Sequence, residues 1–161
     1  MFSVNGVWDL VKGMLMERYY KVFAALDGGK TQAEVLDRAI RLAEANKAEL
    51  LLGHVIDAVP DAMTGTDYRN LAEIVKERIE EELSEQIEAA RERGRISKIT
   101  VDVKVGHIQE TLTNEIIKPF DPDVVVCGER GLSNIKYVFV GSVSTYLIRN
   151  LRCDVLVVKK D

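Results

Sequence analysis

Apolar residues follow two alternating patterns along the chain from about residue 19 onward. Five short runs are rich in Val, Ile and Leu, which is typical of strands buried in a sheet. These runs are Lys21–Asp27, Glu49–Ile56, Ile99–Val105, Asp123–Cys127 and Asp154–Val158. Between them, apolar residues recur every three or four positions, which indicates amphipathic helices. The alternation predicts an α/β fold with a parallel sheet, because each helix can return the chain to the edge where the next strand begins.

Four helices are expected between the strands. Their apolar positions are Leu36, Ala39, Ile40 and Ala43 in the first, Leu71, Val75, Ile79, Leu83 and Ile87 in a long second, Ile108, Leu112 and Ile116 in the third, and Val143, Leu147 and Leu151 in the fourth. Thr31 and Glu34 fit a capping box at the start of the first helix. Gly94 is expected to end the second helix, and Pro119 and Pro122 to stop the third before the next strand.

We expect a doubly wound five-stranded parallel sheet, ordered 3-2-1-4-5, with helices on both faces. In this order, the third and fifth strands along the chain lie at the two edges of the sheet. In Ile99–Val105, apolar residues alternate with polar ones, which suits a half-exposed edge. The last strand, Asp154–Val158, is apolar, and an open apolar edge is a liability. Pairing with the same strand of a second subunit would cover it and make a homodimer. The alternative is that the N-terminal extension covers it.

Size and charge fit one domain of an ordinary globular protein. The chain has 161 residues, of which 47% are apolar and 30% charged, and its net charge is −4. The chain has no block of Lys or Arg, which argues against a nucleic-acid surface and against a charged membrane anchor. Cys127 and Cys153 lie far apart and lack metal-ligand spacing, so we expect reduced thiols. No apolar run is long enough for a membrane helix, and the N-terminus lacks the features of a signal peptide; we expect a cytoplasmic protein.

Two glycine-containing segments carry the candidate chemistry. Cys127-Gly128-Glu129-Arg130-Gly131 follows a buried strand directly, and Gly141-Ser142-Val143-Ser144 starts the fourth helix nine residues later. Glycines allow close backbone approach, and a helix N-terminus offers N–H groups and partial positive charge to a phosphate chain. The serine hydroxyls can donate to phosphate oxygens. On spacing alone, a turn followed by a helix cap explains these glycines equally well.

Asp27 lies at the carboxyl end of the first strand. In the order 3-2-1-4-5, the first and fourth strands are neighbours, and a crevice opens where the winding reverses between them. Asp27 and Gly128 are therefore expected to face each other across this crevice. The carboxylate can accept hydrogen bonds from ribose hydroxyls or an adenine amino group. Alternatively, it accepts donors from the turn at Gly28 and Gly29.

The sequence gives little support for three other folds, the dinucleotide-binding, P-loop and receiver folds, or for a pair of catalytic residues. Neither the dinucleotide-binding Gly-x-Gly-x-x-Gly nor the P-loop Gly-x4-Gly-Lys-Ser/Thr is present. A receiver domain would need an acceptor Asp where Val105 and Gly106 stand. His54 is expected to be a satisfied core histidine, and His107 a solvated turn residue. No nucleophile and base form an evident pair, so we expect no dedicated enzyme.

The span from Tyr20 to Lys159 resembles the ATP-binding branch of the universal stress protein family. Its most specific motif, Gly-x2-Gly-x9-Gly-Ser, is matched in full by Gly128, Gly131, Gly141 and Ser142; the His54-Val55 pair and the final run 153–158 also resemble the family. The resemblance implies a nucleotide site formed by Ala25, Asp27, Val55, Cys127, Gly128, Gly131, Gly141, Ser142, Val143 and Ser144. It also implies dimerisation through the last strand, Asp154–Val158.

Three residues depart from the family pattern near this site. Gly29 stands where a hydroxyl residue is common. Glu129 puts a carboxylate in the phosphate loop, and the neighbouring Arg130 can compensate by reaching phosphate, so it joins the candidate site. These changes bear on affinity and can favour AMP or ADP over ATP.

The sequence thus predicts an N-terminal extension, residues 1–18, expected to be helical, and a nucleotide-binding α/β domain of the universal stress type, residues 19–161. The expected ligand is ATP, with AMP or ADP as alternatives and Mg²⁺ or Mn²⁺ accompanying the phosphates. The expected role is a dimeric stress-response or signalling switch with an unidentified protein partner and at most slow ATP hydrolysis. The alternative is a non-catalytic interaction protein of the same fold with weak or no nucleotide affinity.

Overall fold

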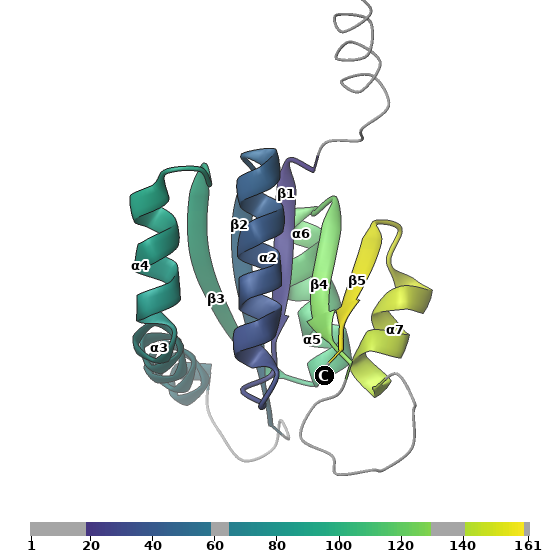
Figure 1. The fold of residues 1–161 in the computed structure, drawn as a ribbon. Helices are drawn as coiled ribbons and strands as arrows, with labels where there is room; N and C mark the ends of the chain where they lie inside the picture. The colour runs from purple at the N-terminus through teal and green to yellow at the C-terminus, as the bar shows by residue number, and fades with distance from the viewer. Residues whose placement is uncertain (1–18, 59–64, 130–140, 160–161) are drawn as a thin grey trace, which may run out of the picture.

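The computed structural model describes residues 19–58, 65–129 and 141–159. Five strands form one sheet in the order β3-β2-β1-β4-β5, and every neighbouring pair is parallel (Figure 1). The strands are β1 (Lys21–Leu26), β2 (Glu49–Asp57), β3 (Lys98–Gly106), β4 (Val124–Gly128) and β5 (Asp154–Val158). The predicted fold class and strand order are confirmed. The extension, residues 1–18, lies outside the described residues, so its helix stays a prediction.

Helices cover both faces of the sheet. One face carries α2 (Gln32–Asn46), α3 (Gly65–Glu82) and α4 (Ser84–Arg93). The other carries α5 (Ile108–Thr111), η2 (Leu112–Ile117), α6 (Lys118–Phe120) and α7 (Ser142–Asn150). Each face has its own apolar cluster, and the fully buried side chains of β1 alternate between them: Val22 and Ala24 on the α2 side, Phe23 on the other.

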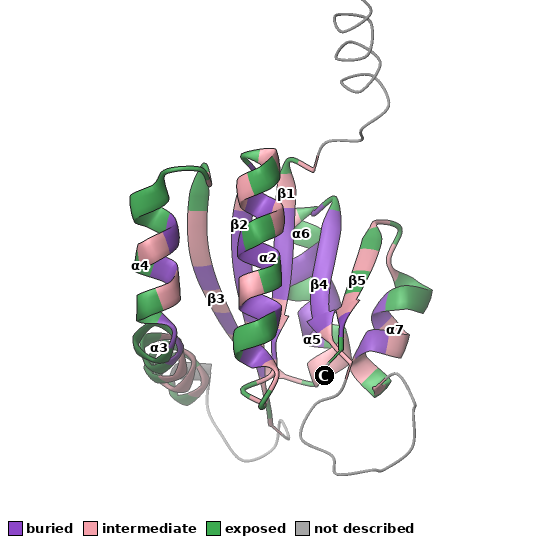
Figure 2. Cartoon of the chain, in the orientation of Figure 1, coloured by how far each residue is buried: buried purple, intermediate pink, exposed green. Residues whose placement is uncertain are grey.

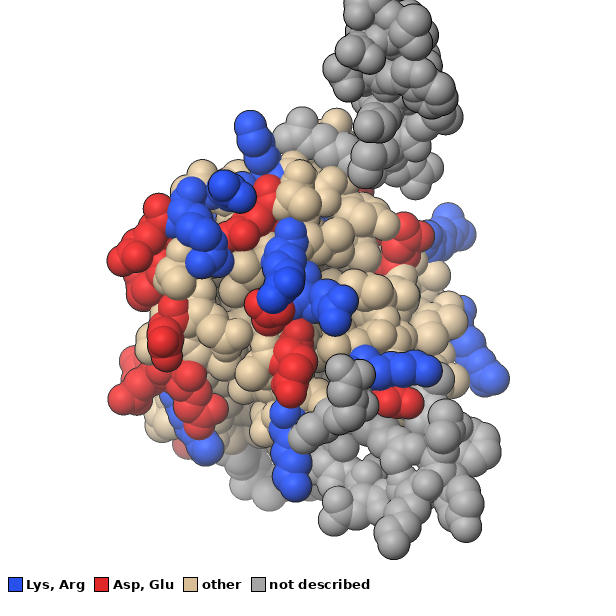
Figure 3. Space-filling view, viewed as in Figure 1, with Lys and Arg blue, Asp and Glu red and all other residues tan. Residues whose placement is uncertain are grey.

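Burial is deepest in the central strands and falls toward both edges (Figure 2). In β3, Val101 and Val103 are buried and Asp102 between them is half-exposed, as the alternating pattern predicts, whereas Ile99 and Val105 are only half-buried. At the opposite edge, Leu156 of β5 is 38% exposed. Acidic side chains gather over α3 and α4, at the left of Figure 3, and include Glu77, Glu80, Glu81 and Glu85, all exposed.

The predicted long second helix is wrong, because it is divided at Leu83 into α3 and α4. Its apolar residues recur every four positions, whereas a helix has about 3.6 residues per turn. A straight helix would therefore rotate Ile87 about 160° away from the direction of Leu71. The break, with φ −106° and ψ 9° at Leu83, keeps both Leu83 and Ile87 buried. The Ser84 hydroxyl donates to the Glu81 carbonyl at 2.8 Å at this junction.

Two other predicted helix boundaries need correction. Thr31 precedes α2 but its side chain makes no capping hydrogen bond, so the capping box with Glu34 is wrong. Pro119 does not stop the third helix but lies within α6, directly after the wider turns of the π-helix η2. The helix ends instead at Asp121, which adopts a left-handed conformation with φ 54°, just before Pro122. The predicted end at Gly94 is confirmed, with φ 60°.

Candidate functional site

A pocket of about 540 Å³ opens at the carboxyl ends of β1 and β4, a size ordinary for a small-molecule site. Its described lining comes from six elements, β1, β2, α5, η2, β4 and α7, and from residues directly next to them. The residues are Ala25, Leu26, Asp27, Val55, Ile108, Leu112, Cys127, Gly128, Glu129, Gly141, Ser142, Val143 and Ser144. The pocket therefore lies where the winding of the sheet reverses, which is where such folds bind ligands.

The structure brings together nine of the site residues predicted from sequence: Ala25, Asp27, Val55, Cys127, Gly128, Gly141, Ser142, Val143 and Ser144. Asp27 and Gly128 line the same pocket from the ends of adjacent strands, as the strand order predicts. Arg130 and Gly131 lie outside the described residues, so their part in the site stays a prediction. Most of the chain between β2 and α3 and between β4 and α7 lies outside them too.

Sequence reasoning missed three apolar residues of the pocket, Leu26, Ile108 and Leu112. The sequence identifies Ile108 and Leu112 only as apolar positions of a helix, and helical spacing does not distinguish core from pocket. A usable signal exists, because α5 follows β3 directly and so begins at the same end of the sheet as Asp27 and Gly128.

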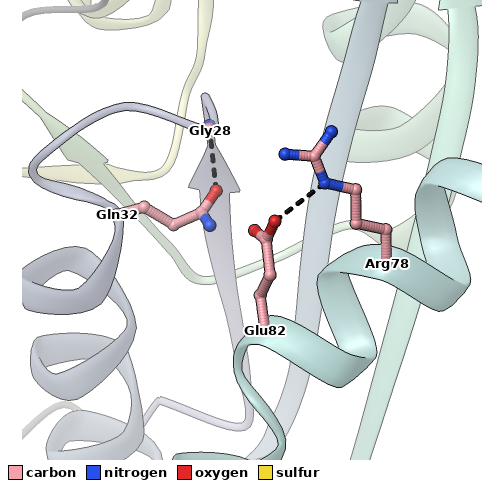
Figure 4. Close-up of polar contacts among 4 residues, drawn as sticks. All are labelled: Gly28, Gln32, Arg78 and Glu82. Atoms are coloured by element: carbon pink, nitrogen blue, oxygen red, sulfur yellow. Dashed lines mark hydrogen bonds and ion pairs between the residues drawn. The ribbon is translucent and has the colours of Figure 1, made fainter.

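The turn after β1 holds the Asp27 carboxylate in place. Asp27 Oδ1 accepts a hydrogen bond from the Gly29 N–H at 2.7 Å, and Gly28 adopts φ +71°, which favours glycine. The Gln32 side chain is 7% exposed and accepts from the Gly28 N–H at 2.9 Å through Oε1 (Figure 4). Within the described residues, Asp27 Oδ2 makes no hydrogen bond, so one oxygen holds the turn and the other is available to a ligand.

The same figure shows the ion pair between Arg78 and Glu82 on α3, with 2.8 Å between Nε and Oε1. Both side chains are largely exposed, so the pair contributes little to stability. Neither residue lines the pocket. The polar contact that matters for the site in this view is therefore the one between Gln32 and Gly28.

Backbone hydrogen bonds join the two ends of the segment between β4 and α7. The Gly141 N–H donates to the Glu129 carbonyl at 2.7 Å, and the Glu129 N–H donates to the Val158 carbonyl of β5 at 2.8 Å. The Ser144 hydroxyl lies 3.0 Å from the Gly141 carbonyl and 3.5 Å from the Glu129 carbonyl. These contacts fix Glu129 and Gly141 side by side at the wall of the pocket.

The two serines of α7 therefore have different environments, whereas the sequence analysis expects that both hydroxyls can donate to phosphate. Ser144 is 2% exposed and its single hydroxyl proton is used within the protein. Ser142 is exposed and lines the pocket. The first N–H groups of α7 have no partner within their own helix, and its N-terminus carries partial positive charge at the pocket. An anion in the pocket would thus meet backbone N–H groups and the Ser142 hydroxyl.

Burial, charge and hydrogen bonding set the environments of the Cys127 thiol and of the two imidazoles, His54 and His107. Burial, and next the charge of Asp27, raise the pKa of the Cys127 thiol to about 11. The thiol is therefore protonated at neutral pH and a poor nucleophile. His54 is half-buried, and its Nδ1 lies 2.7 Å from the Leu26 carbonyl, to which it donates. His107 is exposed at the start of α5, as expected.

The strand order and the pocket at the winding reversal define a doubly wound α/β domain with a ligand crevice of the usual kind. The universal stress protein family matches residues 18–159 of the chain. A universal stress protein of Synechocystis sp. is 31% identical over 154 residues, which cover 88% of this chain and 98% of the relative. The chain therefore belongs to the universal stress protein family, a family of stress-response modules.

Solved structures of the family share the fold. A universal stress protein in complex with cAMP is 24% identical, with a TM-score of 0.64, covering 89% of this chain and 98% of the other. The UspA protein of Lactobacillus plantarum is 19% identical, with a TM-score of 0.61, covering 89% and 99%. Within the ranges that the structure describes, no helix combines the length and apolar character needed to cross a membrane.

The different environments of the two serines predict different effects of their removal. Ser144→Ala should lower the free energy of unfolding by about 1 kcal/mol, because the buried hydrogen bond from the Ser144 hydroxyl to the Gly141 carbonyl is lost. Ser142→Ala is the matched control and should stay within about 0.5 kcal/mol of the unmodified protein. Urea unfolding followed by circular dichroism measures both. Equal stabilities of the two variants would contradict the role assigned to Ser144.

The raised pKa of Cys127 predicts a loss of stability in alkali. The folded pKa of about 11 exceeds the ordinary value of 9.0, so the unfolded chain releases this proton first. The stabilising contribution is complete below about pH 9 and is lost as the pH rises through about 11, a change of about 3 kcal/mol. Urea unfolding at about pH 8 and about pH 10.5 should show a smaller fall in Cys127→Ala than in the unmodified protein. Equal falls in the two proteins would refute this assignment.

Proposed function

We propose that this protein binds an adenine nucleotide in the pocket between β1 and β4 and acts as a nucleotide-dependent switch in the stress response. The observation that carries the proposal is the convergence of Asp27, Gly128 and the N-terminus of α7 on one pocket. A carboxylate on one side suits ribose hydroxyls. Glycines and helix N–H groups on the other suit phosphate.

The lining divides into regions that match the parts of a nucleotide. Ala25, Val55 and Leu112 provide apolar surface for a base. Asp27 has a free oxygen for the ribose, and Gly141 and Ser142 begin the helix that would receive phosphate. A relative solved in complex with cAMP supports an adenine nucleotide as the ligand class. Mg²⁺ or Mn²⁺ would enter bound to the phosphates.

A switch without dedicated catalysis fits the chemistry of the described residues. The Cys127 thiol is protonated at neutral pH, and His54 uses one ring nitrogen on the Leu26 carbonyl. Neither group is poised as nucleophile or general base. Hydrolysis of a bound triphosphate would then depend on a positioned water alone and would be slow.

The exposed edge at β5 is the proposed output surface. Glu129 of the pocket donates to Val158 at the end of β5, so the site and this edge share a backbone hydrogen bond. Leu156 of β5 and Ile148 of α7 are large, exposed apolar residues. Pairing of β5 with its copy in a second subunit would cover the open edge, giving a homodimer.

Leu156→Lys tests the proposed dimer. The added charge should oppose pairing of two β5 edges, so the variant should sediment as a monomer at micromolar concentration, where the unmodified protein is a dimer. Ile74→Lys is the matched control, because Ile74 is 63% exposed on α3, far from β5 in the sheet order. A dimer that survives Leu156→Lys, or a monomeric unmodified protein, would rule out this interface.

Asp27 variants test nucleotide binding directly. Asp27→Ala should weaken adenine nucleotide binding about 10- to 100-fold in isothermal titration, because hydrogen bonds to a charged acceptor contribute about 1.5–3 kcal/mol. Asp27→Asn keeps an oxygen for the Gly29 N–H, so a weakening shared by both variants is not due to a disrupted turn. Asp57→Ala is the matched control, since Asp57 is exposed at the end of β2 and does not line the pocket. No measurable binding by the unmodified protein would favour an interaction protein without nucleotide affinity.

A further inference from the structure

The described lining of the pocket contains two charged side chains, and both are acidic. Asp27 stands at the end of β1 and Glu129 directly after β4. The remaining described lining residues are apolar or neutral. Favourable interactions for an anion come from the N-terminus of α7, whose effect equals about half a unit charge. Among the described lining residues, a polyphosphate would face two carboxylates and no cationic side chain.

Glu129 cannot move its backbone away from the pocket without breaking contacts to two elements. Its N–H is bound to Val158 of β5 at 2.8 Å, and its carbonyl accepts from Gly141 at 2.7 Å. Gly141 precedes α7, whose N-terminus is the phosphate end of the proposed site. The backbone of Glu129 therefore stays beside the start of α7, where phosphates would lie in the proposed site.

A negative charge inside this pocket opposes the formation of a second negative charge beside it. The charge of Asp27 contributes to the raised pKa of the neighbouring Cys127 thiol, because it opposes formation of the thiolate. The apolar lining from Val55, Ile108 and Leu112 screens charge less than water does. A phosphate facing a second carboxylate, that of Glu129, would be repelled in the same way.

We propose that Glu129 is a specificity residue that selects against ligand charge, so that the pocket prefers adenine nucleotides with a single phosphate over ATP. This inference rests on the proposed nucleotide binding. Every phosphate beyond the first adds negative charge near the Glu129 carboxylate, whereas the α7 N-terminus serves the first phosphate best. The preferred ligand class is a nucleoside monophosphate or a cyclic monophosphate.

Isothermal titration with adenosine, AMP, cAMP, ADP and ATP tests the proposal, with the unmodified protein and Glu129→Gln. The unmodified protein should bind AMP and cAMP more tightly than ATP. In Glu129→Gln the ratio of the ATP to the AMP dissociation constant should fall about tenfold, while adenosine affinity stays unchanged. Higher salt should lower the ratio in the unmodified protein, because it screens the repulsion. Glu92→Gln on α4 is the matched control, an exposed glutamate outside the pocket with the same change in net charge.

The outcomes separate this proposal from the proposed function. Nucleotide binding with the same ATP-to-AMP ratio in Glu129→Gln and in the unmodified protein overturns the role of Glu129 and leaves nucleotide binding intact. A ratio that falls equally in Glu92→Gln also overturns it, because total charge would then be the cause. Absence of binding for every ligand overturns both proposals. Far-UV circular dichroism establishes that each variant is folded before titration.

Discussion

The pairing of β1 with β4 places the whole candidate site. Val22, Phe23 and Ala24 are in register with Val124, Val125 and Val126 in the centre of the sheet. From β1 the chain winds outward through β2 to β3, and it then returns to place β4 and β5 on the other side. The connections after β1 and β4 therefore leave on opposite faces, and a crevice opens at their carboxyl ends. Without this adjacency, Asp27 and Gly128 would not share a pocket.

A second constraint links the pocket to the edge of the sheet. Glu129 bridges Gly141, which begins α7, and Val158, which ends β5. A ligand that shifts the start of α7 acts on the same residue that is bound to the edge strand. The structure thus provides a short physical path of two backbone hydrogen bonds from the site to the proposed dimer surface.

Local pattern was sufficient to predict the sheet and most of the pocket, whereas errors arose where tertiary packing decides. The predicted strand bounds agree with the structure to within one residue, because a short run of buried apolar residues has few structural interpretations other than a strand. The break at Leu83 was missed because the apolar positions of the predicted long helix continue through it in the sequence. The break is needed only to pack α4 on the sheet. The hydroxyls of Thr31 and Ser144 were assigned by position, although spatial neighbours determine which partner a hydroxyl finds. Gly131 remains a sequence prediction.

Asp27 and Glu129 show how the fold leaves ligand choice open at one position and restricts it at another. The side chain of Asp27 is part of the turn, and a Cβ on Gly29 would lie 3.0 Å from its Oδ1, so changes here alter structure and ligand contact together. Glu129 contributes to the structure through its N–H and carbonyl alone, which any residue but proline provides. Its side chain is therefore free to vary without cost to the fold. If the pocket binds a nucleotide as proposed, Glu129 combines a fixed backbone with an unconstrained side chain beside the start of α7. Charge selectivity at this position can then change independently of stability.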